Sequence, residues 1–277
     1  MSDRAEIQRA LNRASADGWK AFASHRQRVT ELLRGSGGPS RLCVLGAGNC
    51  NDLDLQTLAR SHREVHLVDL DGDAMVAGVQ RQGLAGHPAI RLHGGVDVAA
   101  VPQRPGAAIA ALARDDIARL ADAPAGVVPP RLPGPFDVVA STCLLSQLID
   151  WAVRAIGEGN EHFLAAVQAI RCGHFRLLVA LTAASGKAVL IADVVSSDTL
   201  PALDAAAPGD LATLLGRAVS RGNFFHGSNP ALLASLPGAD PVLRGQVAAV
   251  DVHPPWLWDL GWRRYAVCAM TLRRRQA

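Results

Sequence analysis

The chain has 277 residues, of which 49% are hydrophobic and 19% charged, and its formal net charge is +3. A chain of this length can bury a large core without disulfides or metal staples, and so small a charge argues against a dedicated nucleic-acid-binding surface. The five cysteines are scattered without zinc-ligand spacing, so we expect reduced thiols, no metal site and a cytoplasmic protein.

Neither terminus suggests targeting or a membrane. No stretch approaches the ~20 apolar residues of a membrane span, and the charged start, Met1–Glu6, lacks the apolar core of a signal peptide. The basic cluster Arg273–Arg275 is expected to be a solvated end of the chain. No repeat or linker divides the sequence, so we predict one domain over residues 1–277; its oligomeric state is left open.

Helix and strand signals alternate after an N-terminal helical cap, residues 1–38. Within that cap, residues 4–34 predict a helix, with a break near Asp17-Gly18. Strands are predicted at 41–45, 64–68 and 89–92, and helices at 51–60 and 73–82. Residues 102–135 contain seven prolines and an Ala-rich stretch, which indicates an insertion with a short helix at 109–120.

The second half continues the alternation of strands and helices and then ends in two successive strand-like segments. Strands are predicted at 136–140 and 188–192, around a helix at 161–184 with Gly186 as its C-terminal cap. Strand-like segments 247–252 and 264–272 follow, separated by Pro254-Pro255 and Leu260-Gly261. Apolar strands between amphipathic helices predict an α/β fold: a Rossmann-like, mainly parallel seven-stranded sheet with helices on both faces and an antiparallel terminal hairpin.

The strongest chemical signal is the glycine turn Gly46-Ala47-Gly48, between the strand at 41–45 and a helix opened by Asn51 or Asp52. Glycine allows a sharp turn and close approach of a ligand, and ligands of open α/β sheets bind beyond the carboxyl ends of the strands. Asp69 ends the next strand, about twenty residues later, where a carboxylate can accept ribose hydroxyls. A plain tight turn and a helix N-cap, which Asp71 or Asp73 could also supply, are the alternatives.

With these motifs the chain resembles the class I S-adenosylmethionine-dependent methyltransferases. Four motifs match in order over roughly residues 40–195: the glycine turn, Asp69, the stretch Asp97–Pro102 and the strand with its loop Phe136–Leu145. The resemblance implies S-adenosylmethionine as cofactor. It also implies a set of cofactor-binding residues: Gly46, Ala47, Gly48 and Asn49 around the methionine part, Asp69 at the ribose, Leu70, Asp97 and Val98 at the adenine, and Ser141 and Thr142 beside the sulfonium.

Two positions depart from the family pattern. Val44 replaces the acid that usually precedes the glycines, and Cys50 replaces the third glycine. The partner of the methionine end is therefore open among four polar residues: Asn49, Asn51, Asp52 and Asp54.

A dinucleotide is the competing ligand. Its fingerprint needs glycine where Asn51 stands. Asp52 and Asp54 would also repel a pyrophosphate at the helix start, whereas they tolerate a sulfonium and an ammonium group.

Residues near the acceptor should follow strands four and five and the terminal hairpin. Catalytic candidates are Gln147, Asp193 and His226, although Asp193 could cap a loop and His226 could be a surface histidine. Trp256 and Trp258 could pack on the sheet or stack on an acceptor, and the N-terminal helix could be a lid or a packing helix. Cys143 and His174 are expected to be core residues.

The sequence therefore predicts a methyltransferase for a small-molecule or natural-product acceptor, with no nucleic-acid or membrane partner. Two alternatives remain. One is a transferase of the same fold that moves an aminopropyl or aminobutyryl group from the cofactor. The other is a non-catalytic S-adenosylmethionine-binding protein.

Overall fold

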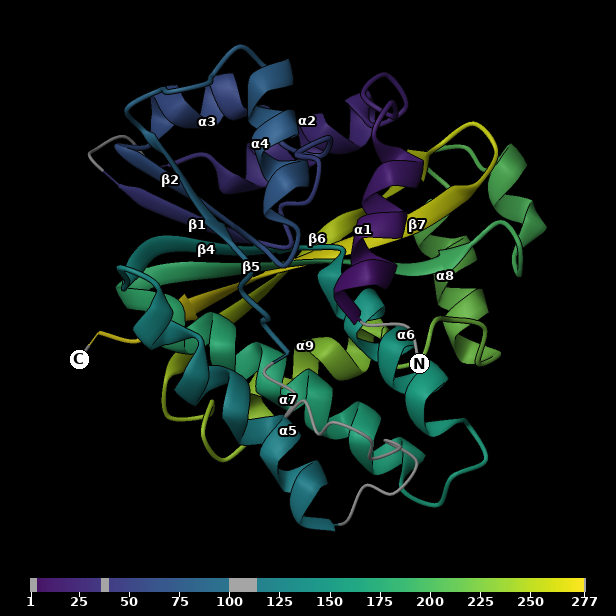
Figure 1. Cartoon of the computed structure of the whole chain (residues 1–277). Helices are drawn as coiled ribbons and strands as arrows, with labels where there is room; N and C mark the ends of the chain where they lie inside the picture. Colours follow the sequence, from purple (N-terminus) through teal and green to yellow (C-terminus); the bar gives the residue numbers. More distant parts are fainter. Residues whose placement is uncertain (1–3, 36–39, 100–113, 277) are drawn as a thin grey trace.

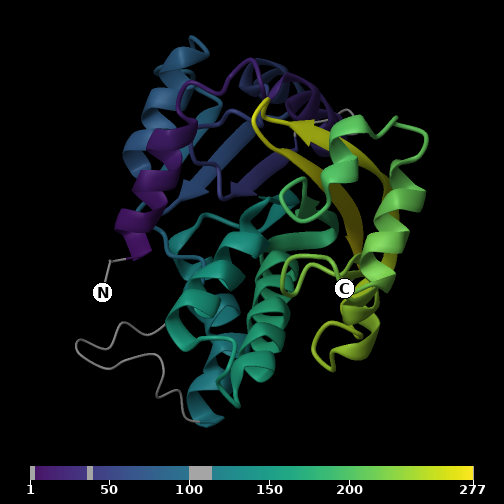
Figure 2. The ribbon, with the colours of Figure 1, turned by 90° about the vertical axis from the view of Figure 1, so that its right-hand side faces the viewer.

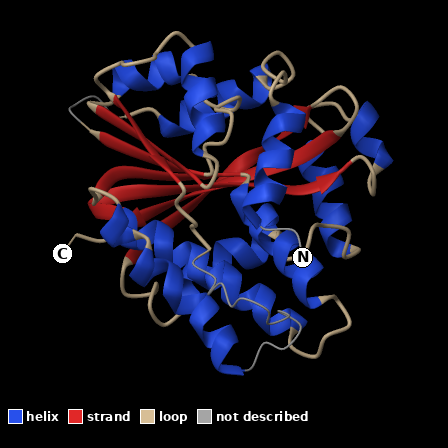
Figure 3. Ribbon diagram, viewed as in Figure 1, coloured by secondary structure: helices blue, strands red, loops and turns tan. Residues whose placement is uncertain are grey.

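The computed structural model describes residues 4–35, 40–99 and 114–276, where a seven-stranded sheet lies between two layers of helices (Figure 1, Figure 3). The strands are β1 (Arg41–Leu45), β2 (Glu64–Asp69), β3 (Ile90–Gly94), β4 (Phe136–Thr142), β5 (Thr182–Ser196), β6 (Val247–Asp259) and β7 (Arg264–Arg274). Their order is β3-β2-β1-β4-β5-β7-β6. The first five are parallel, and β7 is antiparallel to β5 and β6. The predicted fold class is confirmed.

Both faces of the central strands are buried because side chains alternate between two apolar layers. In β1, Leu42 and Val44 face one layer, while Cys43 and Leu45 face the other. The helices of the first layer are α2 (Ala23–Leu33), α3 (Leu55–Ser61) and α4 (Gly72–Arg81). The helices of the second layer are α5 (Arg114–Val127), α6 (Leu144–Ile156), α7 (Phe163–Leu181), α8 (Leu211–Ser220) and α9 (Pro230–Ala239).

The N-terminal region consists of two helices separated at the predicted break near Asp17-Gly18. α1 (Arg4–Ser15) ends just before it, and turns over residues 16–22 lead into α2. α2 packs in the core through Val29 and Leu33, both fully buried. α1 lies in front of the sheet and spans from one helical layer toward the other (Figure 1, Figure 2).

α7 is more apolar than the sequence analysis expected. In the described part of the chain it is the one helix long and apolar enough to cross a membrane, with 19 residues and a mean hydropathy of 1.4. It is nevertheless 61% buried inside the protein. A helix that packs on a sheet and is covered by α5 and α6 needs apolar residues around most of its circumference, and this explains the composition.

The junction of α7 and β5 corrects the prediction for Gly186. The helix ends at Leu181, and β5 begins at once with Thr182, so Gly186 lies inside a strand rather than at a helix cap. A Cβ on Gly186 would lie 2.8 Å from the backbone oxygen of Asp137 in β4. The glycine is thus explained by the close approach of two strands at an irregular register.

The sequence had suggested that the prolines of the terminal hairpin would end the strand, but they do not end β6. The strand continues through Pro254 and Pro255, with a register shift between His253 and Trp256. β6 is the edge strand of the sheet, so the missing N–H groups interrupt no further ladder.

The proline-rich stretch 102–135 is described only from residue 114 onward. The predicted helix 109–120 therefore lies partly outside the described residues, and the observed helix, α5, runs through Pro124 to Val127. α5 packs closely on α7, since a Cβ on Gly173 would lie 2.3 Å from the backbone oxygen of Leu120. Helices α6, α8 and α9 had not been predicted.

Candidate functional site

The glycine turn lies where the strand order reverses, between β1 and β4, which is where open α/β sheets bind ligands. Gly46 and Gly48 have φ values of +77° and +44°. The N–H groups of Gly46 and Ala47 donate to the Val68 oxygen at 2.9 and 3.2 Å, which ties the turn to β2. Cys50, at the position of the third glycine, also adopts a left-handed φ of 54°. The backbone therefore keeps a left-handed conformation there despite the cysteine.

Gly78 of α4 supports this turn and was not singled out from the sequence. A Cβ at Gly78 would lie 2.3 Å from the Asn49 oxygen and 2.7 Å from the Asn49 carbonyl carbon. Only a glycine lets α4 pack directly against the loop. A glycine inside a helix costs stability, so such a residue is a usable signal for close packing.

Asp69 organises the same region through its carboxylate. It accepts hydrogen bonds from Gly48 N at 2.9 Å and from Asp71 N at 2.8 Å. Burial raises the pKa of Asp69, and these backbone hydrogen bonds oppose the shift. The carboxylate thus connects the glycine turn to the start of α4. Its predicted role at a ribose stays a prediction.

The predicted adenine residues lie farther along the strand ends. Asp97 accepts a hydrogen bond from Ala99 N at 2.9 Å, and Val98 is buried. Leu70 is partly buried. Asp69, Leu70, Asp97 and Val98 line neither of the two cavities described below, so their contacts with a cofactor stay predictions.

A cavity of about 430 Å³ opens below the glycine turn. Five of the predicted residues line it: Gly46, Ala47, Gly48, Asn49 and Thr142. Ser141 lies elsewhere, because its side chain is fully buried and its Oγ is 2.8 Å from His174 Nε2 in α7. His174 is thus a core histidine, and burial lowers its pKa to about 4.

The four polar residues left open at the methionine end have different partners. Asn49 donates to Asn12 O at 2.5 Å and to Ser15 Oγ at 3.1 Å. Asn51 donates to Ser15 O at 2.7 Å and accepts from Arg81 at 2.6 Å. Asp54 caps α3 by accepting from Thr57 N at 3.0 Å.

Asp52 is the fourth member of this set, and its carboxylate lines the cavity. It lines the cavity beside Thr142, whose hydroxyl is its hydrogen-bonding neighbour. Burial raises the pKa of Asp52 to about 7, and the Thr142 hydrogen bond opposes that shift. The tertiary structure thereby separates Asp52 from the three residues that hold other parts of the fold.

α1 covers the glycine turn. Asn12 donates to Asp71 Oδ2 at 3.0 Å, and its Oδ1 would be 3.1 Å from a Cβ at Gly48. The Asn49 and Asn51 side chains bind the last turn of α1, and Gln8 and Leu11 line both cavities. The helix is thus a covering element, while α2 behind it is a core helix.

A second cavity of about 530 Å³ adjoins the first. Gln147 and Asp193 line both cavities. Asp193 is 8% exposed and accepts a hydrogen bond from Ser146 Oγ at 2.6 Å. Gln147 donates to Cys143 O at 3.0 Å, and its buried Oε1 has no partner. His226 lies at the rim, with its side chain 48% exposed, 3.2 Å from Glu158. The three catalytic candidates therefore all line the second cavity.

The two tryptophans of β6 differ in role. Trp256 is buried and donates from Nε1 to His25 Nδ1 at 3.1 Å. Trp258 lines the first cavity and stacks on the His25 ring with centroids 4.4 Å apart. Cys143 is buried, and burial raises its pKa well above the usual value, which disfavours the thiolate form. In the described part of the chain, no three His, Cys, Asp or Glu side chains gather as metal ligands would.

No protein-family model and no curated protein matches the sequence. Solved structures similar to it include a magnesium protoporphyrin IX methyltransferase from Synechocystis PCC 6803 with bound SAH, at 13% identity over 99% of this chain and 100% of that one, TM-score 0.49. An rRNA methylase from Streptococcus thermophilus is similar at 13% identity over 91% and 94%, TM-score 0.41. An O-methyltransferase family protein from Burkholderia thailandensis is similar at 15% identity over 99% of this chain and 60% of that one, TM-score 0.42.

Proposed function

We propose that this chain is an S-adenosylmethionine-dependent methyltransferase that acts on a small-molecule acceptor. The observation that carries the proposal is Asp52, a carboxylate that lines a cavity together with a left-handed glycine turn and forms no ion pair within 4 Å among the described residues. Arg26 acts on it by charge but donates to the backbone oxygens of Trp19 and Asn51. A cofactor with a sulfonium and an ammonium group supplies a cation that can bond directly to this carboxylate.

The residues present fit such a cofactor at its methionine end. Asp52 and the Thr142 hydroxyl offer oxygen acceptors to an ammonium group, and the backbone of Gly46 to Gly48 can approach the ligand without a Cβ. In the family pattern an acid stands where this chain has Val44, and Asp52 would take over the role of that acid. A pyrophosphate does not fit, because Asp52 would repel it.

The chain's own residues would hold and shield the reactants. When bound, the cofactor supplies an activated methyl group on a sulfonium. Asp69 and Asp97 are proposed to hold the adenosine part, while α1 covers the turn and excludes water from it. Methyl transfer depends mainly on alignment and desolvation, so a covered cavity beside a second cavity suits the reaction.

The first test is calorimetry with S-adenosylmethionine, S-adenosylhomocysteine and NAD. We expect the two sulfur compounds to bind and NAD not to bind. Asp52→Asn should weaken S-adenosylmethionine binding roughly tenfold or more, since hydrogen bonds to charged groups contribute about 1.5–3 kcal/mol. 5′-Methylthioadenosine lacks the amino-acid part, so its binding should not change.

Asp73→Asn is the matched control, since it makes the same charge change on the exposed side of α4. Binding of NAD in place of S-adenosylmethionine would refute the proposal. Mass analysis of the products would distinguish methyl transfer from aminopropyl or aminobutyryl transfer, and would show no product for a non-catalytic binder.

A further inference from the structure

The second cavity lies between α6, the end of β5 and the loop before α9. Its rim carries charged groups that are paired with one another. Arg154 donates to Asp150 at 2.7 Å, and His226 lies 3.2 Å from Glu158. These pairs leave little net charge at the entrance, so the rim offers no basic surface for a polyanion.

The inner wall of this cavity is different because it holds one carboxylate without a cationic partner. Asp193 is buried, and among the described residues no Lys, Arg or His forms an ion pair with it. Arg263 also lines both cavities, and its charge acts on Asp193, but its described bonds go to Asp198 and, at 3.0 Å, to the Tyr265 hydroxyl. Asp193 therefore has no hydrogen-bonded cation among the described residues.

Aromatic side chains line the same cavity and continue into the first one. Among the described residues, the second cavity is lined by Trp151, Phe224, Phe225 and Tyr265, and the first by Tyr265 with Phe22, Trp258 and Trp262. Tyr265 is central, with ring centroids 6.2 Å from Phe225 and 5.2 Å from Trp258. Trp258 continues the row to Phe22 at 4.8 Å.

A carboxylate beside aromatic rings is a binding arrangement for organic cations. Ring faces attract ammonium groups, and the carboxylate supplies a charged hydrogen-bond acceptor. An anionic ligand would be repelled by the ionised Asp193 carboxylate. A neutral alcohol would leave the carboxylate without a hydrogen-bonded cation, so an amine fits the wall best.

We propose that the second cavity binds a small aromatic or amphiphilic amine as the methyl acceptor, with the amino group beside Asp193 and the apolar body among the aromatic side chains. The proposal rests on the proposed function, because the amine is assigned as acceptor for the cofactor in the first cavity. Asp193 lines both cavities, which places the amino group at their junction.

The proton balance assigns Asp193 its part. A bound ammonium group gives one proton to the carboxylate, and its nitrogen then has a free electron pair. That pair forms the new N–C bond to the methyl group, and the sulfur keeps the electrons of the broken C–S bond. Burial raises the pKa of Asp193, which makes the carboxylate a better proton acceptor. Ser146 positions it through the hydrogen bond at 2.6 Å.

The test measures binding before turnover. Phenethylamine, tryptamine and benzylamine are titrated by calorimetry into the protein saturated with S-adenosylhomocysteine, beside 2-phenylethanol and 3-phenylpropionate. We expect at least one amine to bind tenfold or more tighter than 2-phenylethanol, and 3-phenylpropionate not to bind. Asp193→Asn should remove that preference, and Ser146→Ala should reduce it in part.

Asp210→Asn, an exposed carboxylate at the start of α8 whose side chain makes no capping bond, is the charge control and should keep the preference. Thermal melting of each variant shows whether it is folded. Equal binding of amine and alcohol, no amine binding, or an unchanged preference in Asp193→Asn and Ser146→Ala would overturn the assignment. S-adenosylhomocysteine titrated alone tests the proposed function separately, since its failure to bind would refute the cofactor site whatever the amines do.

Discussion

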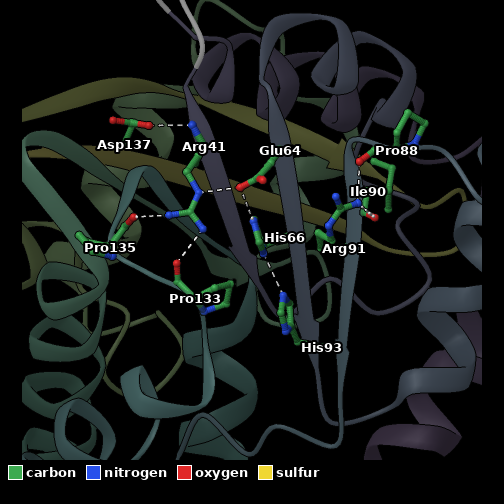
Figure 4. A network of polar contacts seen from close by, with 10 residues as sticks. All are labelled: Arg41, Glu64, His66, Pro88, Ile90, Arg91, His93, Pro133, Pro135 and Asp137. Carbon is green, nitrogen blue, oxygen red and sulfur yellow. Dashed lines mark hydrogen bonds and ion pairs between the residues drawn. The ribbon is translucent and has the colours of Figure 1, made fainter.

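Two polar regions of the sheet use ionisable side chains in opposite ways. One lies near the amino ends of β1 and β2 and reaches β3 (Figure 4). There Arg41 donates to Glu64 at 2.7 Å, Glu64 lies 3.3 Å from His66, and His66 Nδ1 lies 2.9 Å from His93 Nε2. Arg41 also donates to backbone oxygens of the loop before β4. The polar groups of this network satisfy one another's hydrogen-bonding capacity.

The inner walls of the cavities at the carboxyl ends lack such pairing, unlike the rim of the second cavity. Among the described residues, Asp52 and Asp193 have no ion-pair partner, and three buried atoms around them make no hydrogen bond: Gln147 Oε1, Trp258 Nε1 and Arg263 Nε. Buried polar groups are normally satisfied, so a cluster of exceptions indicates a place completed by a ligand. The polar groups of the paired network therefore stabilise the fold, whereas the unpaired groups of the cavities are available to bind a ligand.

The largest effect is expected at the packing contact that supports the cavity. Gly78→Ala places a methyl group 2.3 Å from the Asn49 oxygen, so α4 or the glycine turn must shift. We expect a loss of about 1–3 kcal/mol in stability, together with loss of most cofactor binding, measured by denaturant unfolding and calorimetry. Gly216→Ala in α8, where a Cβ meets nothing within 4 Å, is the control. Unchanged cofactor binding in Gly78→Ala would contradict the role assigned to this contact.

A smaller effect, confined to stability, is expected in the paired network. His66→Leu removes the hydrogen bond to His93 and should cost about 1–2 kcal/mol while leaving cofactor affinity unchanged. Burial lowers the pKa of both His66 and His93.

The unfolded chain therefore binds protons more readily than the folded one, and stability should fall as the pH drops below about 6.5. His66→Leu should reduce this acid sensitivity, as urea unfolding at several pH values would reveal. Weaker cofactor binding in this variant would contradict the assignment of the paired network to stability alone.

The smallest effect is a pH dependence of binding. Asp52 has a pKa raised to about 7 by burial, so it is partly protonated at neutral pH and becomes ionised as the pH rises. Affinity for S-adenosylmethionine should therefore increase roughly fivefold from pH 6 to 7, below the pKa of about 7.7–8.0 that is usual for an α-amino group such as the ligand's. Calorimetry should give a flat profile for Asp52→Asn. A rise that survives in this variant would assign the titration to another group.

Local patterns were sufficient for much of the fold. The strands from 41 to 94 and helix α4 follow directly from apolar runs, glycines and capping residues, because these signals depend on near neighbours. The errors occur where distant segments decide the structure. Gly186 reads as a cap but serves a contact with Asp137, and the prolines of β6 are tolerated because that strand is at the edge.

The candidate site divides in the same way. The sequence by itself determined the glycine turn, its place after the first strand and the polar residues that follow it. Only the tertiary structure decided among those residues, because Asn49, Asn51 and Asp54 find partners far away or in their own helix, while Asp52 faces a cavity. It likewise brought Asp193 of β5 beside Tyr265 of β7. Whether a polar group is paired depends on contacts between distant segments, and a local pattern does not contain them.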